Sequence, residues 1–166
     1  MKVIFLDFDG VLLPTSHYAT EKADPKCVVT LNEITDQTQA KIVISSDWRH
    51  YGLIKCQNYL EEWGVTGEVI GLTPSLTTKP HQESSIYLAV ERWVEIRTWL
   101  DTHNVESFVI LDDFWPMREL SHRYVKTKEE EGLTITDAAL AIRLLGISEL
   151  LTYGTAHRQS VPPFPS

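Results

Sequence analysis

Three short apolar segments, each ending in acids or hydroxyls, constrain the fold of this 166-residue chain more than any other feature. The segments and the polar residues at their ends are residues 2–6 with Asp7 and Asp9, residues 41–45 with Ser45 and Ser46, and residues 107–111 with Asp112 and Asp113. Apolar runs of this length are typical of strands that are buried on both faces of a parallel sheet. Ligands bind such sheets at the carboxyl ends of the strands, so the polar residues are expected to converge there.

Segments with helical periodicity alternate with these strands. Four helices are expected: one that starts at Asp24 and Pro25, one over residues 53–63 that ends at Gly64, one over residues 92–103 that ends at Asn104, and one that starts at Thr136 and Asp137 and ends at Gly146. Two further strands are expected, over residues 65–72 and from Tyr124. This alternation predicts an α/β fold, a three-layer sandwich with a central parallel sheet between helices.

The length and the apolar content of 43% suit one domain, which we place at residues 1–152. Residues 153–166 contain three prolines and are expected to form a poorly ordered tail. The only two cysteines, Cys27 and Cys56, lie on expected helices, so we interpret them as buried apolar residues rather than as a disulfide or a metal pair.

The chain carries 15 basic and 23 acidic residues, a formal charge of −8. Such a surface repels polyanions, which argues against non-specific binding to nucleic acid or to anionic membranes. Asp7 interrupts the N-terminal apolar run too early for a signal peptide, and no apolar run is long enough to span a membrane. We therefore expect a cytoplasmic protein.

The sequence Asp7-Phe8-Asp9-Gly10 places two carboxylates on one side of a strand end, followed by a glycine that permits a sharp turn. With the Asp112-Asp113 pair nearby, four acids would repel one another unless a cation neutralised them, and oxygen ligands favour Mg²⁺. An EF-hand calcium loop is excluded because Val11 occupies the position of its third ligand.

The motifs DFDGVL, KIVISS and VILDD occur in the order typical of the haloacid dehalogenase-like (HAD) superfamily, which the chain resembles over residues 2–146. Most members are Mg²⁺-dependent phosphatases that work through an aspartyl-phosphate. A closer resemblance is to the small HAD domains of multidomain RNA-repair proteins. Three elements carry it: the Ser-Ser-x-Trp-Arg sequence at residues 45–49, the helix at residues 92–100 and Gly-Leu-Thr at residues 132–134.

The resemblance implies a role for each matched residue. Asp7 would be the nucleophile, and Asp9 would protonate the leaving group and then activate water. Mg²⁺ would be held by the Asp7 carboxylate, the Asp9 carbonyl and one acid of the Asp112-Asp113 pair, with Asp113 favoured as the direct ligand. Ser45 and Ser46, with backbone N–H groups after Asp7 and Ser45, would bind the phosphate.

A cation must offset the charge of the transferring phosphoryl group. The resemblance suggests Arg92, whereas Lys79 in the preceding loop is the alternative. Arg49 either contacts substrate phosphate or pairs with an acid, and Trp48 is expected to be a packing residue rather than a base-stacking surface.

The leading hypothesis is a phosphomonoesterase, and the alternatives are a small-molecule phosphatase, a phosphotransferase or a regulatory module that binds phosphorylated ligands without turnover. The presence of both Asp7 and Asp9 favours catalysis. Residues 10–25 are too short for a folded cap domain, so little or no cap is expected. An uncapped site favours a macromolecular substrate, with a nucleic-acid end first and a phosphoprotein second. A nucleic-acid end would require a local basic mouth formed by Arg49, Lys79 and Arg92.

Overall fold

The computed structural model describes residues 1–76 and 90–147 of the chain. Its centre is a five-stranded, all-parallel sheet with the strand order β3-β2-β1-β4-β5. The strands are β1 (Lys2–Leu6), β2 (Lys41–Ile44), β3 (Val69–Leu72), β4 (Ser107–Asp112) and β5 (Tyr124–Lys126). The predicted α/β sandwich is confirmed, and the three apolar segments form the three central strands.

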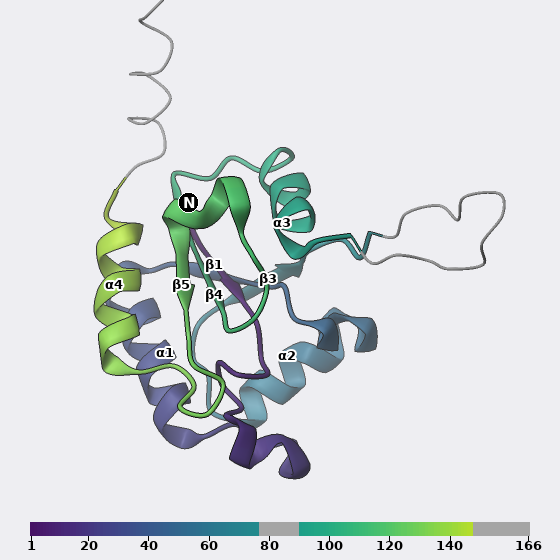
Figure 1. The fold of residues 1–166 in the computed structure, drawn as a ribbon, viewed down its shortest axis with the longest axis vertical. Coiled ribbons are helices and arrows are strands. Elements are labelled where there is room, and N and C mark those ends of the chain that lie inside the picture. Colours follow the sequence, from purple (N-terminus) through teal and green to yellow (C-terminus); the bar gives the residue numbers. More distant parts are fainter. Residues whose placement is uncertain (77–89, 148–166) are drawn as a thin grey trace, which may run out of the picture.

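Helices cover both faces of this sheet (Figure 1). Helices α1 (Pro25–Thr38), α2 (Leu53–Glu62) and α4 (Ile135–Leu145) pack on the face that carries Ile4 and Leu6 of β1. Helix α3 (Arg92–Leu100) and the 3-10 helix η3 (Arg118–Arg123) pack on the opposite face, against Val3 and Phe5. Alternate residues of the same strand thus build two separate apolar cores, as the two-residue period of a strand requires.

Capping residues determine where two of these helices begin. Asp24 accepts a hydrogen bond from the Lys26 backbone N–H (2.8 Å), and Pro25 follows, as predicted for the start of α1. The N-cap of α4 is Thr134, two residues before the predicted Thr136, because Thr134 and Asp137 form a reciprocal capping box. The predicted start at Thr136 was therefore wrong.

Two other predicted boundaries were also wrong. Helix α3 ends at Leu100 rather than at residue 103, and Asn104 is not left-handed, because the side chains of Thr102 and His103 bond to the Trp99 carbonyl oxygen. Strand β3 begins at Val69 rather than at residue 65. The segment before it is bonded instead to Asn32 of α1, through the Gly64 carbonyl and the Thr66 N–H.

The described residues contain no separately folded cap. The 3-10 helix η1 (Thr15–Thr20) lies between β1 and α1, and the described residues between the 3-10 helix η2 (Asp47–Tyr51) and α3 form only α2, β3 and short connections. Lys79 and the expected tail at residues 153–166 lie outside the described residues. Across residues 1–76 and 90–147, no helix has the length and apolar character needed to cross a membrane.

Candidate active site

The ends of the three central strands meet at one edge of the sheet. Leu6 of β1 is in register with Ile44 of β2 and Leu111 of β4, so the residues that follow these strands are neighbours. The Asp7 N–H donates to the Leu111 carbonyl (3.0 Å), and the Ser45 N–H donates to the Leu6 carbonyl (2.9 Å). The expected convergence of polar residues at this edge is therefore present, at the point where the strand order reverses direction.

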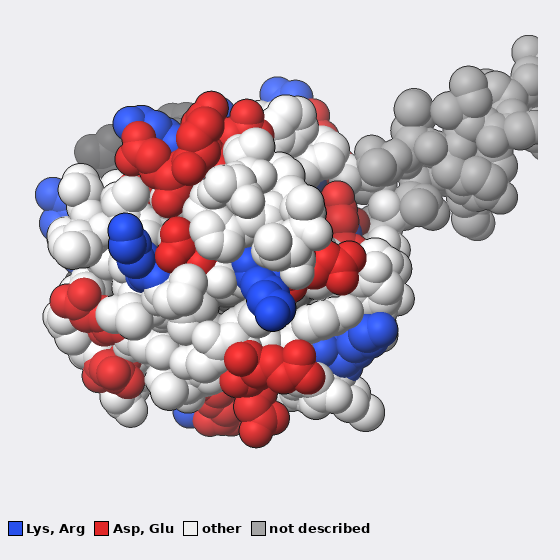
Figure 2. All heavy atoms as spheres, turned by 90° about the horizontal axis from the view of Figure 1, so that it is seen from below, with Lys and Arg blue, Asp and Glu red and all other residues white. Residues whose placement is uncertain are grey.

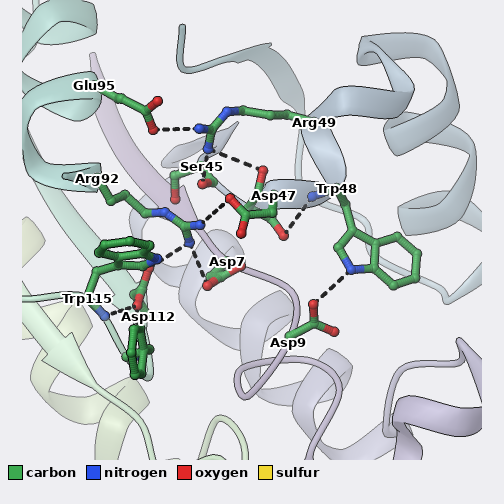
Figure 3. A network of polar contacts seen from close by, with 12 residues as sticks. Asp7, Asp9, Ser45, Asp47, Trp48, Arg49, Arg92, Glu95, Asp112 and Trp115 are labelled. Carbon is green, nitrogen blue, oxygen red and sulfur yellow. Dashed lines mark hydrogen bonds and ion pairs between the residues drawn. The ribbon is translucent and has the colours of Figure 1, made fainter. Parts of the chain in front are cut away.

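Arg92, the first residue of α3, is buried among three carboxylates (Figure 3). Its Nη1 donates to Oδ2 of Asp7 (2.6 Å) and Oδ2 of Asp112 (2.9 Å), and its Nη2 donates to Oδ1 of Asp47 (2.9 Å). Burial opposes the charge of the guanidinium group, but these three acids outweigh that effect and raise the pKa of Arg92. Arg92 is thus a fixed positive charge beside Asp7.

Burial and neighbouring negative charge disfavour the ionised forms of Asp7 and Asp113. Burial raises the pKa of the Asp7 carboxyl, and the neighbouring Asp112 adds to the rise while Arg92 opposes it. Burial, followed by the charge of Asp112, also raises the pKa of Asp113. One carboxylate oxygen each from Asp7, Asp112 and Asp113 lie within 4.8 Å of one another. This donor set suits a hard divalent cation, which would favour the ionised carboxylates.

Gly10 allows the Asp113 side chain to come this close. Gly10 has φ +69°, and a Cβ atom added there would lie 2.3 Å from Cγ of Asp113. The carbonyl oxygen of Gly10 accepts a hydrogen bond from the Thr127 hydroxyl (2.7 Å), which fixes the turn after Asp9. The glycine predicted to permit a sharp turn therefore also makes room for Asp113, the third acid of the cluster.

Asp112 has both carboxylate oxygens engaged within the protein. Its Oδ1 accepts hydrogen bonds from the backbone N–H groups of Phe114 (2.9 Å) and Trp115 (3.0 Å), while its Oδ2 accepts from Arg92. The side chain is fully buried, whereas that of Asp113 is only partly buried. Of the two adjacent acids, Asp112 is therefore the one whose position is fixed by the chain.

Asp9 is held by an indole that sequence reasoning treated as packing alone. Nε1 of Trp48 donates to Oδ2 of Asp9 (2.9 Å), and the Trp48 ring packs edge-to-face against Phe8 and Trp63. Figure 3 shows Asp7 between Arg92 on one side and Asp9 with Trp48 on the other. The two carboxylates of the first motif thus have different surroundings, which is the usual basis for two different roles.

Two buried hydroxyls that directly follow strands at this edge have no hydrogen-bond partner within the described part of the chain. They are Ser45 Oγ, directly after β2, and Thr73 Oγ1, directly after β3. Ser46 differs, because its hydroxyl caps η2 by accepting from the Trp48 N–H (3.3 Å). Buried polar atoms are almost always hydrogen-bonded, so an unsatisfied hydroxyl beside the acids suits a ligand oxygen. Thr73 was not predicted, although it is also the first polar residue after a strand.

Arg49 pairs with an acid, which is one of the two roles considered for it. Its Nη2 donates to Oε2 of Glu95 (2.5 Å), and its Nη1 donates to the carbonyl oxygens of Ser45 (2.6 Å) and Ser46 (3.3 Å). Both side chains of the ion pair are buried. Sequence reasoning missed Glu95 and also Asp47. Glu95 lies one helical turn after Arg92, and this i, i+3 spacing is the signal that could have identified it.

The basic mouth that a nucleic-acid end would require is not formed by the described arginines. Arg92 is buried and paired with three carboxylates, and the side chain of Arg49 is only 9% exposed and paired with Glu95. In Figure 2, which views the molecule from below Figure 1, acidic and basic side chains are interspersed with uncharged surface. Among the described residues on that face, the basic side chains form no continuous patch. The site's own acids neutralise both arginines.

Comparison with known proteins gives one match. The model of one protein family, described as the HAD domain in Swiss Army Knife RNA repair proteins, matches residues 3–138. No curated protein and no solved structure matches the chain. The matched range begins within β1 and ends within α4, so it includes every element that contributes to the acid cluster.

Proposed function

Because the chain belongs to the family of HAD domains found in Swiss Army Knife RNA repair proteins, we propose that it is a Mg²⁺-dependent phosphomonoesterase that forms an aspartyl-phosphate on Asp7. The observation that carries this proposal is the environment of Asp7. Its carboxylate lies at a strand end, bonded to the Arg92 guanidinium, within a cluster of oxygen ligands, and two residues before a second acid. In this proposal these groups supply the nucleophile, the counter-charge and the proton donor.

In the first step, a carboxylate oxygen of Asp7 forms a bond to phosphorus while the bond between phosphorus and the leaving oxygen breaks. Asp9 donates its proton to that leaving oxygen. In the second step, water attacks the phosphorus of the acyl-phosphate, its proton passes to Asp9, and the bond to Asp7 breaks. The Trp48 indole donates a hydrogen bond to Oδ2 of Asp9, so the other carboxylate oxygen is the one that carries the proton in this proposal.

Asp7, Asp113 and the Asp9 carbonyl would hold Mg²⁺, and the ion would offset the negative charge of the phosphoryl oxygens. Of the two adjacent acids, Asp112 is the one whose side chain is fully buried and whose two oxygens both accept hydrogen bonds from the protein, whereas Asp113 is only partly buried. Asp112 orients Arg92 and the backbone after Asp113. We therefore assign Asp113 as the direct ligand and Asp112 as its support.

The remaining contacts to the phosphoryl group would come from Ser45 and from Arg92. The unsatisfied Ser45 hydroxyl can donate to a phosphoryl oxygen, and Arg92 supplies a buried positive charge at constant position. Lys79 remains a second candidate for a cation near the phosphate. Phosphoryl transfer depends mainly on positioning and charge, which is what these groups provide.

We propose a macromolecular substrate, with a nucleic-acid end first and a phosphoprotein second. The family description supports the first class, since it refers to RNA repair proteins. The lack of a folded cap in the described residues supports a large substrate of either class, because nothing there encloses a small metabolite.

Asp7→Asn tests the proposal, because it removes the nucleophile at constant size. We expect it to abolish Mg²⁺-dependent release of phosphate from p-nitrophenyl phosphate and from end-phosphorylated oligonucleotides, with an unchanged circular dichroism spectrum. Asp36→Asn, an exposed acid on α1, is the matched control and should retain activity. Near wild-type turnover by Asp7→Asn would eliminate the mechanism. Tight binding of phosphorylated ligands by the wild-type protein without any turnover would favour a regulatory binding module.

A further inference from the structure

A second surface feature lies outside the acid cluster, where η2 leads into α2. It is a hollow of about 880 Å³ that we call the Tyr51 hollow, and its lining includes Tyr51, Ile54, Lys55, Asn58, Tyr59 and Glu62. Tyr51 is 44% exposed and Ile54 is 75% exposed. Packing of α2 onto the sheet is provided by Cys56 and Leu60, so it does not account for these exposed apolar side chains.

The Tyr51 hollow is connected to the candidate active site through Trp48. The Trp48 ring centroid lies 5.2 Å from that of Tyr59 and 6.0 Å from that of Tyr51. The indole Nε1 of the same residue donates to Asp9. One aromatic ring therefore separates the Tyr51 hollow from the carboxylate that faces the leaving group in the proposed mechanism.

The position of Asp9 determines on which side of the site the body of the substrate must lie. Asp9 protonates the leaving oxygen, and in a macromolecular substrate that oxygen belongs to the rest of the chain. In Figure 3, Asp9 and Trp48 lie on the side of Asp7 opposite to Arg92 and Trp115. A substrate with its phosphate at Asp7 therefore extends towards Trp48, and the Tyr51 hollow is the surface beyond it.

The chemistry of the Tyr51 hollow suits a flat, aromatic ligand group with a phosphate beside it. The Lys55 ammonium lies 5.0 Å from the Tyr51 ring centroid and 5.7 Å from that of Tyr59, so the two rings face a cation. The lining carries one lysine and one glutamate and is neutral overall, in contrast to the chain's charge of −8. Stacking on tyrosine accepts any base, whereas Lys55 can pair with a backbone phosphate.

We propose that the Tyr51 hollow binds a nucleobase of an unpaired oligonucleotide whose terminal phosphate lies at Asp7. This inference rests on the proposed phosphatase function and names its substrate as a single-stranded nucleic-acid end. It also explains how a chain with no continuous basic patch on the face shown in Figure 2 can act on a polyanion: recognition depends on stacking and on few phosphate contacts.

The test compares two substrates in one variant. Tyr51→Leu removes the ring and keeps an apolar side chain. The ratio of kcat/KM for an end-phosphorylated oligonucleotide to kcat/KM for p-nitrophenyl phosphate should fall about 5- to 150-fold, the range for loss of one stacked base. An oligonucleotide with abasic sites at its last two positions should show the same low ratio with the wild-type protein, and Tyr51→Leu should not lower it further.

Phe114→Leu is the matched control. Phe114 is 70% exposed and follows Asp112 and Asp113, with its ring edge-to-face against Trp115 on the opposite side of the site. This variant should leave the substrate ratio unchanged.

A second measurement tests the contact between Lys55 and phosphate. Oligonucleotide binding is measured by fluorescence anisotropy in the Asp7→Asn background. Lys55→Gln should reduce the slope of log affinity against log salt by about 0.7, which corresponds to the loss of one single-strand phosphate contact.

The outcomes separate this inference from the proposed function. If the wild-type protein shows no turnover of p-nitrophenyl phosphate that depends on Asp7, the proposed function fails. Asp7-dependent turnover with a substrate ratio unaffected by Tyr51→Leu, or lowered by Phe114→Leu instead, would overturn the inference alone. A phosphopeptide preferred over the oligonucleotide and sensitive to Tyr51→Leu would also overturn it, because the Tyr51 hollow would then bind protein.

Discussion

The buried ion pair between Arg49 and Glu95 gives a prediction whose size follows from the geometry. The side chains of Arg49 and Glu95 are 9% and 4% exposed, and each also bonds to backbone: Arg49 to the Ser45 and Ser46 carbonyls, and Glu95 to the Leu76 N–H. Glu95→Gln keeps the shape of the side chain but leaves the guanidinium group buried without a counter-charge. Removing one partner of a buried pair costs about 3–5 kcal/mol.

We expect Glu95→Gln to lower the free energy of unfolding by about 3 kcal/mol, the lower end of that range, because the glutamine oxygen still accepts a hydrogen bond. The measurement is urea-induced unfolding followed by circular dichroism, with the change read from the midpoint at an unchanged m value. Asp101→Asn, at the C-cap of the same helix, is the control. It removes an exposed acid that pairs with Arg97 at 3.2 Å, and exposed pairs contribute about 0–1 kcal/mol.

The double variant Arg49→Met with Glu95→Leu should recover part of the lost stability, since the Ser45 and Ser46 carbonyls and the Leu76 N–H still lose their side-chain partners. Burial raises the pKa of Glu95 although Arg49 lies beside it, so the pair does not fully offset the cost of removing its charges from water. Apolar replacement of both partners removes that cost, and such replacements are often neutral or stabilising. If Glu95→Gln costs no more than Asp101→Asn, the pair is not buried as described and the reasoning is refuted.

Two further predictions concern the acid cluster. Mg²⁺ should raise the melting temperature measured by calorimetry, and more at pH 8 than at pH 5. Burial raises the pKa of Asp7, so the metal-free protein loses stability as the pH rises through that pKa, and a bound cation removes this loss. An equal change in melting temperature at both pH values, or no change, would contradict the assignment of the metal site. Gly10→Ala should weaken Mg²⁺ binding at least about tenfold in a calorimetric titration, because its Cβ would collide with Asp113. Gly64→Ala, which has φ +89° but open space around its Cβ, should strain the backbone without changing the affinity, and equal affinities in the two variants would count against the assignment of Asp113.

The sequence predicted those parts of the site that depend on where strands end. Asp7, Ser45 and Asp112 could be brought together in advance because each lies at the carboxyl end of a buried strand and parallel strands end at the same edge. Arg92 was found through the family resemblance of its helix. The convergence of the strand ends needed only local pattern and topology, whereas the choice of Arg92 needed the resemblance.

The contacts that depend on tertiary geometry could not be predicted. The fold of η2 brings Asp47 to Arg92 and turns the Trp48 indole towards Asp9, and no spacing in the sequence expresses either contact. The same holds for Arg49, whose two possible roles were separated only by the position of Glu95 on α3. The start of α4 was missed for a different reason: Thr134 and Thr136 are both good N-cap residues, and the choice depends on the side chain of Asp137.

Asp9→Asn offers a way to observe the proposed intermediate. The variant lacks the acid that protonates the leaving group, but p-nitrophenolate leaves with little need for a proton, so the first step should proceed. The second step should be slow because no base activates the attacking water, with a loss of about 10²–10⁴-fold. The acyl-phosphate should therefore accumulate in this variant and in no other.

The most direct test of the account is to mix Asp9→Asn with p-nitrophenyl phosphate and Mg²⁺, quench in acid and map the covalent phosphate by peptide mass spectrometry. We predict one phosphate on the peptide that contains Asp7, and none when Asp7→Asn is added to the same variant. Phosphate on any other residue, or continued release of p-nitrophenol by the double variant at the rate of Asp9→Asn alone, would contradict the assignment of Asp7 as the nucleophile.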